Sequence, residues 1–181
     1  MANPNDPNGF KPVRGVGGSA CFRTNRYFVS SAYTAIIGVG AMVQRADGYV
    51  KVVVAEPTEV LGVSAEYLAS STGGWISVYD EPTQWFEVQV DDNTDTTELG
   101  YVGNCFKMLG TNASNSTTLH SKQQLDGSSA AAYAASITFL HSMGISKKIG
   151  NDAATSWTRL HVMVAPVVNI HANQTPTESA L

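Results

Sequence analysis

The sequence predicts an all-β fold, either jelly-roll-like or an antiparallel β-barrel or sandwich, with an extended N-terminal arm. Apolar and polar side chains alternate with period two in Trp85–Val90 and again from Leu160 to Val164, which is typical of strands with one buried face. The dipeptide Asp47-Gly48 separates two apolar runs and suits the positive φ angles of a tight hairpin turn. No segment requires an amphipathic helix longer than two turns.

We divide the chain into three parts. Residues 1–20 form the extended arm, because Pro4, Pro7 and Pro12 exclude a helix and remove ladder donors. Residues 21–172 form a single β domain, as expected for 181 residues and 19.2 kDa. Residues 173–181 are polar and are expected to form a loose tail.

Short strands with turn signals between them at fairly regular spacing are typical of a barrel or sandwich. Residues 110–129 are polar and predict a long loop. Residues Ala134–His141 are ambiguous, because alanine favours helix whereas Ile137 and Thr138 favour strand, and we assign a strand. The expected strands are Asn25–Val29, Gly40–Ala46, Tyr49–Ala55, Glu59–Leu68, Trp75–Asp80, Trp85–Val90, Tyr101–Leu109, Ala134–His141 and a last one that starts near Trp157 and is interrupted by Pro166.

The charge distribution is uneven. The net charge is −4, yet Val52 to Phe106 contains no lysine or arginine, and all its charged residues are acidic. An acidic middle is a poor match for nucleic acid, whereas it suits contact with the basic ends of the chain, within a subunit or between subunits. The sequence contains no run of 18 apolar residues, so it predicts no membrane-spanning helix. The N-terminus lacks the apolar segment of a signal peptide. Cys21 and Cys105 are expected to be buried thiols.

We expect no metal and no other cofactor. The histidines form no HxH or HxxxH pair, and we interpret His161 as a packed core or interface residue. The acidic loop after Val90 lacks the register of a calcium-binding EF-hand loop, so a solvated turn is favoured. The four histidines are His120, His141, His161 and His171. The acidic loop contains Asp91, Asp92, Asn93, Asp95 and Glu98.

Carboxylates near aromatic residues leave two alternative functions open. Asp80 and Glu87 lie close in sequence to aromatic side chains, an association that glycosidases and sugar-binding modules use. One alternative is therefore a glycan-binding module, and the other is a hydrolase using Asp80 or Glu87. The nucleophile elbow and the phosphate-binding loop are both missing from the sequence, and we expect no enzyme. The aromatic candidates for sugar stacking are Trp75, Tyr79, Trp85 and Trp157.

Several segments follow, in order, the pattern of one family of structural proteins. They are ANPNDPNGFKPVR, GAMVQRADGYVKVVVAEPTEVLGV, VYDEPTQWFEVQVDD, QLDGSS and WTRLHVMVAPVVNIH. In this combination the chain resembles the capsid cement, or head decoration, proteins of tailed bacteriophages, with residues 110–122 unmatched. The arm and the D-x-P-x-x-x-F-E-V-Q strand carry most of the resemblance.

The resemblance implies a non-catalytic β protein that forms a small homo-oligomer, a dimer or trimer, and clamps neighbouring major capsid protein subunits. It implies synthesis in the host bacterial cytoplasm and a final place on the outer face of the virion's capsid, with no role for nucleic acid or membrane. Weak contacts suffice in such an oligomer, because multivalency raises avidity by roughly 10²–10⁴. The candidate capsid or subunit contacts are Phe10, Lys11, Arg14, Asp80, Glu87, Asp91 and Asp92.

Overall fold

The fold is given by a computed structural model that describes residues 3–14, 22–54, 57, 59–91, 101–109, 114, 116–132, 140–152, 156–166, 168, 169 and 171. The regular elements of this part of the chain are all strands. They are β1 (Lys11–Arg14), β2 (Asn25–Val29), β3 (Met42–Ala46), β4 (Tyr49–Val52), β5 (Gly62–Ser64), β6 (Gly74–Tyr79), β7 (Trp85–Gln89), β8 (Asn104–Met108), β9 (Leu125–Ala132), β10 (Leu140–Ile145) and β11 (Arg159–Val164).

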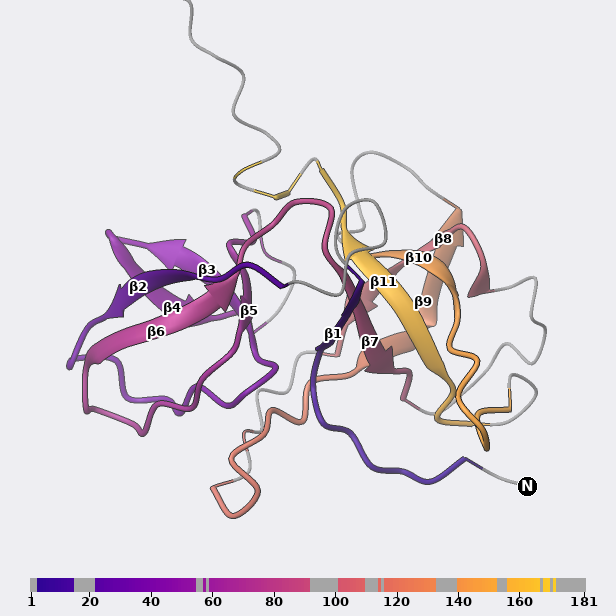
Figure 1. Cartoon of the computed structure of the whole chain (residues 1–181), viewed down its shortest axis with the longest axis horizontal. Coiled ribbons are helices and arrows are strands. Elements are labelled where there is room, and N and C mark those ends of the chain that lie inside the picture. The colour runs from indigo at the N-terminus through magenta and orange to yellow at the C-terminus, as the bar shows by residue number, and fades with distance from the viewer. Residues whose placement is uncertain are drawn as a thin grey trace, which may run out of the picture.

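The strands form two antiparallel sheets in a sandwich-like fold, which confirms the all-β prediction (Figure 1). The larger sheet has the order β1-β7-β11-β10-β8-β9, and the smaller sheet has the order β2-β6-β5-β3-β4. Asp47 and Gly48 make the predicted tight turn between β3 and β4, with φ angles of 54° and 83°.

One hydrophobic core joins the two sheets. Alternation in β11 buries Leu160, Val162 and Val164 and leaves Arg159, His161 and Met163 on the opposite, outer face of the larger sheet. The smaller sheet contributes Met42 of β3 and Val63 of β5 to the same core. The sheets are therefore held together by shared apolar burial, the dominant stabilising term in folding.

The smaller sheet curls around a second core of its own. Ile76 and Val78 of β6 pack there with Val43 and Val50 of the β3–β4 hairpin. The two outer strands of this sheet approach each other, since the Phe28 ring of β2 lies 6.0 Å from the Tyr49 ring of β4. The smaller sheet thus forms a barrel-like lobe beside the larger sheet (Figure 1).

The described part of the N-terminal arm belongs to the folded structure. Strand β1 pairs with β7, so that Lys11 lies opposite Glu87. The Phe10 ring is 1% exposed and packs edge-on against Phe86, with the ring centroids 6.4 Å apart. Gly9 makes this entry possible, because it has a φ of +65° and a Cβ there would lie 2.5 Å from the Gly40 carbonyl oxygen.

Three expected elements differ most from the observed strands. The strand predicted over Glu59–Leu68 is limited to the three residues of β5, Gly62–Ser64. The loop predicted over 110–129 is wrong at its C-terminal end, where Leu125–Ala132 forms β9 and pairs with β8. Its small polar residues have weak strand preference, so the ladder with β8 and the burial of Leu125 determine its conformation. The strand predicted over Ala134–His141 overlaps β10, Leu140–Ile145, only at Leu140 and His141. Residues 133–139 lie outside the described part, as do 15–21 and 172–181.

Candidate functional site

The most prominent exposed feature is an aromatic patch formed by Phe28, Tyr49 and Trp75 on the smaller sheet. Their exposed fractions are 41%, 45% and 57%. The Phe28 ring lies 5.5 Å from Trp75 and 6.0 Å from Tyr49, so the three rings are contiguous. Exposed apolar clusters of this kind mark interaction surfaces more often than isolated exposed residues do.

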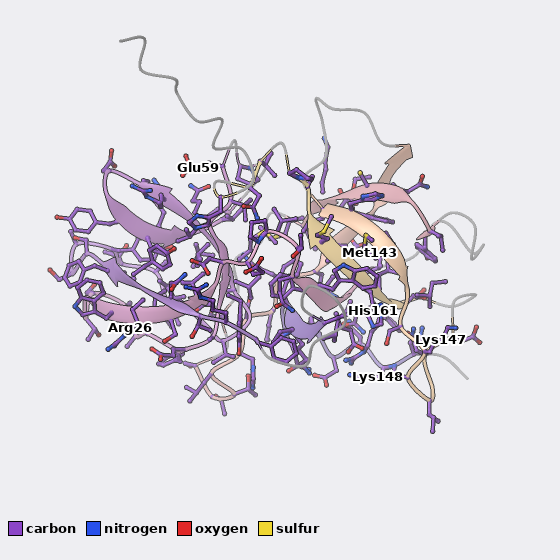
Figure 2. All side chains as sticks on the ribbon, turned by 45° about the horizontal axis from the view of Figure 1, so that its top comes forward. Arg26, Glu59, Met143, Lys147, Lys148 and His161 are labelled. Carbon is purple, nitrogen blue, oxygen red and sulfur yellow. The ribbon has the colours of Figure 1, made fainter. Side chains whose placement is uncertain are left out.

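Strand alternation explains why these rings face outward. Each aromatic residue precedes a buried side chain on its strand, such as Val29 after Phe28 and Ile76 after Trp75. Because the following residue enters the barrel-like core, the aromatic residue must point to the outside. Arg26 lies two residues before Phe28 on β2 and is exposed at the outer part of this lobe (Figure 2).

The structure brings only one of the four predicted sugar-stacking residues into this patch. Trp75 is exposed, whereas Tyr79 packs against the shared core. Trp85 is half-buried on the larger sheet, with the Arg14 guanidinium 5.0 Å from its ring centroid, and Trp157 is also half-buried. The sequence interpretation missed Phe28 and Tyr49, because only strand pairing places them beside Trp75.

Asp80 anchors a polar network at the end of β6. Its carboxylate is 5% exposed, and Oδ2 accepts hydrogen bonds from Asn25 Nδ2 at 2.8 Å and from the Tyr27 hydroxyl. His171 Nε2 lies 3.5 Å from the same oxygen and 3.2 Å from the Tyr27 oxygen. Burial, together with the hydrogen bond to Asp80 and the charge of Asp80, raises the pKa of Tyr27, so this phenol stays protonated and serves as a donor.

A hollow of about 210 Å³ opens beside this network. Arg23, Glu81 and Pro82 line it together with Asp80, Asn25 and His171. The network joins β2, the end of β6 and the segment after β11, which are far apart in sequence. Asp80 therefore holds three segments together and presents little of its own carboxylate at the surface.

Glu87 is the centre of an ionic cluster on the outer face of the larger sheet. Its carboxylate is 2% exposed, and Oε1 lies 2.6 Å from Lys148 Nζ and 3.7 Å from Arg159 Nη1. The Ser146 hydroxyl donates to Oε2 at 2.7 Å. Burial alone would raise the pKa of Glu87, but these hydrogen bonds and the positive charges of Lys148 and Arg159 outweigh it and lower the pKa.

Lys11 faces the same cluster from β1. Burial and the charges of Arg159 and Lys148 lower its pKa, while Glu87 acts in the opposite direction. The hollow beside Lys11 and Glu87 has a volume of only about 10 Å³, which is the space of one water molecule. The buried carboxylate is consequently part of a structural ion network.

The predicted contact residues fall into different environments. Phe10, Asp80 and Glu87 are buried in the chain, so their side chains offer no accessible surface for a capsid contact in this structure. Lys11 is half-buried and Arg14 is exposed. Asp91 is half-buried and accepts a hydrogen bond from the Gly127 amide at 2.8 Å, and Asp92 lies outside the described residues.

The remaining findings concern metals, thiols and membranes. Within the described ranges, no group of three or more His, Cys, Asp or Glu side chains is arranged to hold a metal ion. Cys105 is a buried free thiol, and Cys21 lies outside these ranges. The part of the chain seen in the structure includes no helix long and apolar enough to cross a bilayer.

Comparison with known proteins adds no relative, because no family model, curated protein or solved structure matches this chain.

Proposed function

We propose that this protein is a capsid cement, or head decoration, protein that docks on the outer face of a phage head and holds neighbouring major capsid protein subunits together. The observation that carries the proposal is the aromatic patch of Phe28, Tyr49 and Trp75. The resemblance of the arm and the Asp80–Asp91 segment to cement proteins supplies the kind of partner.

The composition of the aromatic patch supports docking on a protein. Aromatic residues and arginine are enriched in the centres of protein–protein interfaces, and Arg26 lies beside Phe28 on β2. The rings are carried by paired strands, so little conformational freedom is lost when they are covered. A single patch of three rings gives modest affinity, and a homo-oligomer that binds through several copies of the patch at once has a much higher avidity.

The way the two sheets are joined supports a bridging role. The shared core and the pairing of β1 with β7 fix the N-terminal residues and both sheets to each other. A clamp between subunits has to transmit force without opening, and such cross-connection supplies that stiffness.

Glycan binding is the second candidate, and the exposure of Trp75 favours it. Sugar rings stack on exposed aromatic faces, and Trp75 offers the largest of these in the aromatic patch at 57% exposure. Trp75 is thus the expected contact residue in both proposed functions, and only the identity of the bound partner distinguishes the two.

The test is sedimentation of the full-length protein with phage heads that lack it, in parallel with a glycan array. We expect the protein to pellet with assembled heads and to bind free capsid subunits weakly. Trp75→Ala should weaken head binding at least tenfold, as for an aromatic interface anchor worth about 2 kcal/mol. Ile149→Ala, which removes an exposed apolar side chain outside the aromatic patch, should leave binding unchanged.

Two results decide against the proposal. Failure to pellet with heads that lack the protein would remove the cement function. Binding on the array that is lost in Trp75→Ala, with the fold intact by circular dichroism, would instead establish the glycan-binding module.

A further inference from the structure

Two triplets of the pattern His-x-Met lie on neighbouring strands of the larger sheet. His141-Ser142-Met143 belongs to β10, and His161-Val162-Met163 belongs to β11. The strands pair antiparallel, and His141 lies directly opposite Met163. Directly opposed residues have Cβ atoms about 4.5–5.5 Å apart, so an imidazole and a thioether meet across the ladder.

All four chemically active side chains lie on the outer face of the sheet. The residues between them, Ser142 and Val162, are buried with 1% and 0% exposure and form an opposed pair on the core face. Because strand side chains alternate, each histidine and methionine of the triplets therefore points away from the core. Each of the four is half-buried, which suits side chains that gather on one face.

A β-bulge brings Met143 next to His161. The register shifts between Ser142 and Gly144, and Gly144 is the residue opposite His161. Met143 is thus the additional residue of the bulge and shares the face of His161. Gly144 has a φ of +146°, and a Cβ placed there would meet no atom within 4 Å other than those of its chain neighbours. Figure 2 labels Met143 and His161 on the larger sheet, with Lys147 and Lys148 on the same side of the molecule.

Strand β7 lies on the other side of β11 and places two residues beside the triplet of β11. Trp85 lies opposite Met163, and Glu87 lies opposite His161. The Glu87 carboxylate accepts hydrogen bonds from Lys148 and Ser146, so we assign it to the ionic cluster and not to the metal ligands. The Trp85 ring is on this face too, and it already has the Arg14 guanidinium 5.0 Å from its centroid.

We propose that the two His-x-Met triplets form a binding site for Cu(I), with the imidazoles of His141 and His161 and the thioethers of Met143 and Met163 as ligands. Soft thioethers select Cu(I) among the metals that imidazole accepts. Imidazole and thioether ligands add no negative charge to the site, and a monovalent ion is repelled less by the nearby Lys148 and Arg159 than a divalent ion would be.

The test is an anaerobic titration of the full-length protein with Cu(I) against a chromogenic Cu(I) chelator, and with Ag(I) as a redox-inert probe. We expect one equivalent to bind, and the double variant Met143→Leu/Met163→Leu to lose at least tenfold in affinity. Leucine keeps the size and apolarity of methionine, which preserves packing. The matched control is Met108→Leu, which removes a thioether buried at 5% exposure in the shared core and should leave binding unchanged.

A second readout reports on the ligands directly. The ε-methyl NMR signals of Met143 and Met163 should shift on addition of Ag(I), while those of Met42 and Met108 in the core stay in place. His141→Gln/His161→Gln should weaken binding independently of the methionine variants, and His120→Gln should not. Zn(II) should cause no shift of the methionine signals.

The proposal is overturned if no stoichiometric Cu(I) binding occurs, or if the Met143→Leu/Met163→Leu protein, folded by circular dichroism, binds as the unmodified protein does. It is also overturned if Ag(I) shifts the core methionine signals to the same extent as those of the two triplets.

Discussion

Replacing Phe10 with alanine tests whether the described N-terminal residues belong to the core. The ring is 1% exposed and packs against Phe86 within the core shared by both sheets. Removing a buried phenylalanine costs about 3–5 kcal/mol, a large share of the roughly 5–15 kcal/mol by which a domain is stable. With a urea m-value of about 2 kcal/mol/M, the unfolding midpoint should fall by roughly 1.5–2.5 M.

The matched control is Phe28→Ala, the same substitution at an outward-facing position with 41% exposure. Its side chain keeps much of its contact with water in the folded state, so we expect a loss below about 1 kcal/mol. Urea titrations followed by circular dichroism measure both variants. A loss below about 1 kcal/mol for Phe10→Ala as well would refute the assignment of Phe10 to the core and return residues 3–14 to a loose arm.

Three further predictions concern the interior. The pKa of Glu87 is lowered in the folded state, so its contribution to stability is present above its usual pKa of 4.5 and is lost as the pH falls through the folded pKa. The free energy of unfolding should therefore fall less steeply below pH 4.5 in Glu87→Gln than in the unmodified protein. Parallel plots of unfolding free energy against pH for the two proteins would contradict this. Tyr27→Phe removes a donor to the buried Asp80 carboxylate and should cost about 1–3 kcal/mol by urea titration, whereas an unchanged midpoint would show that the network contributes nothing. Gly62→Ala places a Cβ 2.2 Å from the Tyr79 carbonyl oxygen and should cost about 1–3 kcal/mol or more, and a thermal melt at the unmodified temperature would disprove the close approach.

The strands whose bounds were predicted closely carry aromatic and β-branched side chains, which favour strands. Asn25–Val29 is observed with the predicted bounds, and Trp85–Gln89 differs from its prediction by one residue. By contrast, β1 and β9 consist of proline-containing or small residues, and they become strands because β7 and β8 offer them a ladder. Such strands are determined by tertiary pairing, to which local preference contributes little.

The same distinction applies to the sites. Asp80 and Glu87 stand out in sequence as carboxylates near aromatic residues, but their burial depends on partners far along the chain, such as Lys148 above Glu87. The aromatic patch combines residues from β2, β4 and β6, which only the curled sheet brings together. The two His-x-Met triplets are visible in the sequence, yet their opposition needs the register of β10 and β11.

Cryo-electron microscopy of phage heads assembled with and without this protein tests the proposed function most directly. The account predicts additional two-lobed density on the outer face of the head, placed between neighbouring major capsid protein subunits, with Trp75 in the contact. Heads that show no difference density, or density in which the aromatic patch faces solvent, would contradict it.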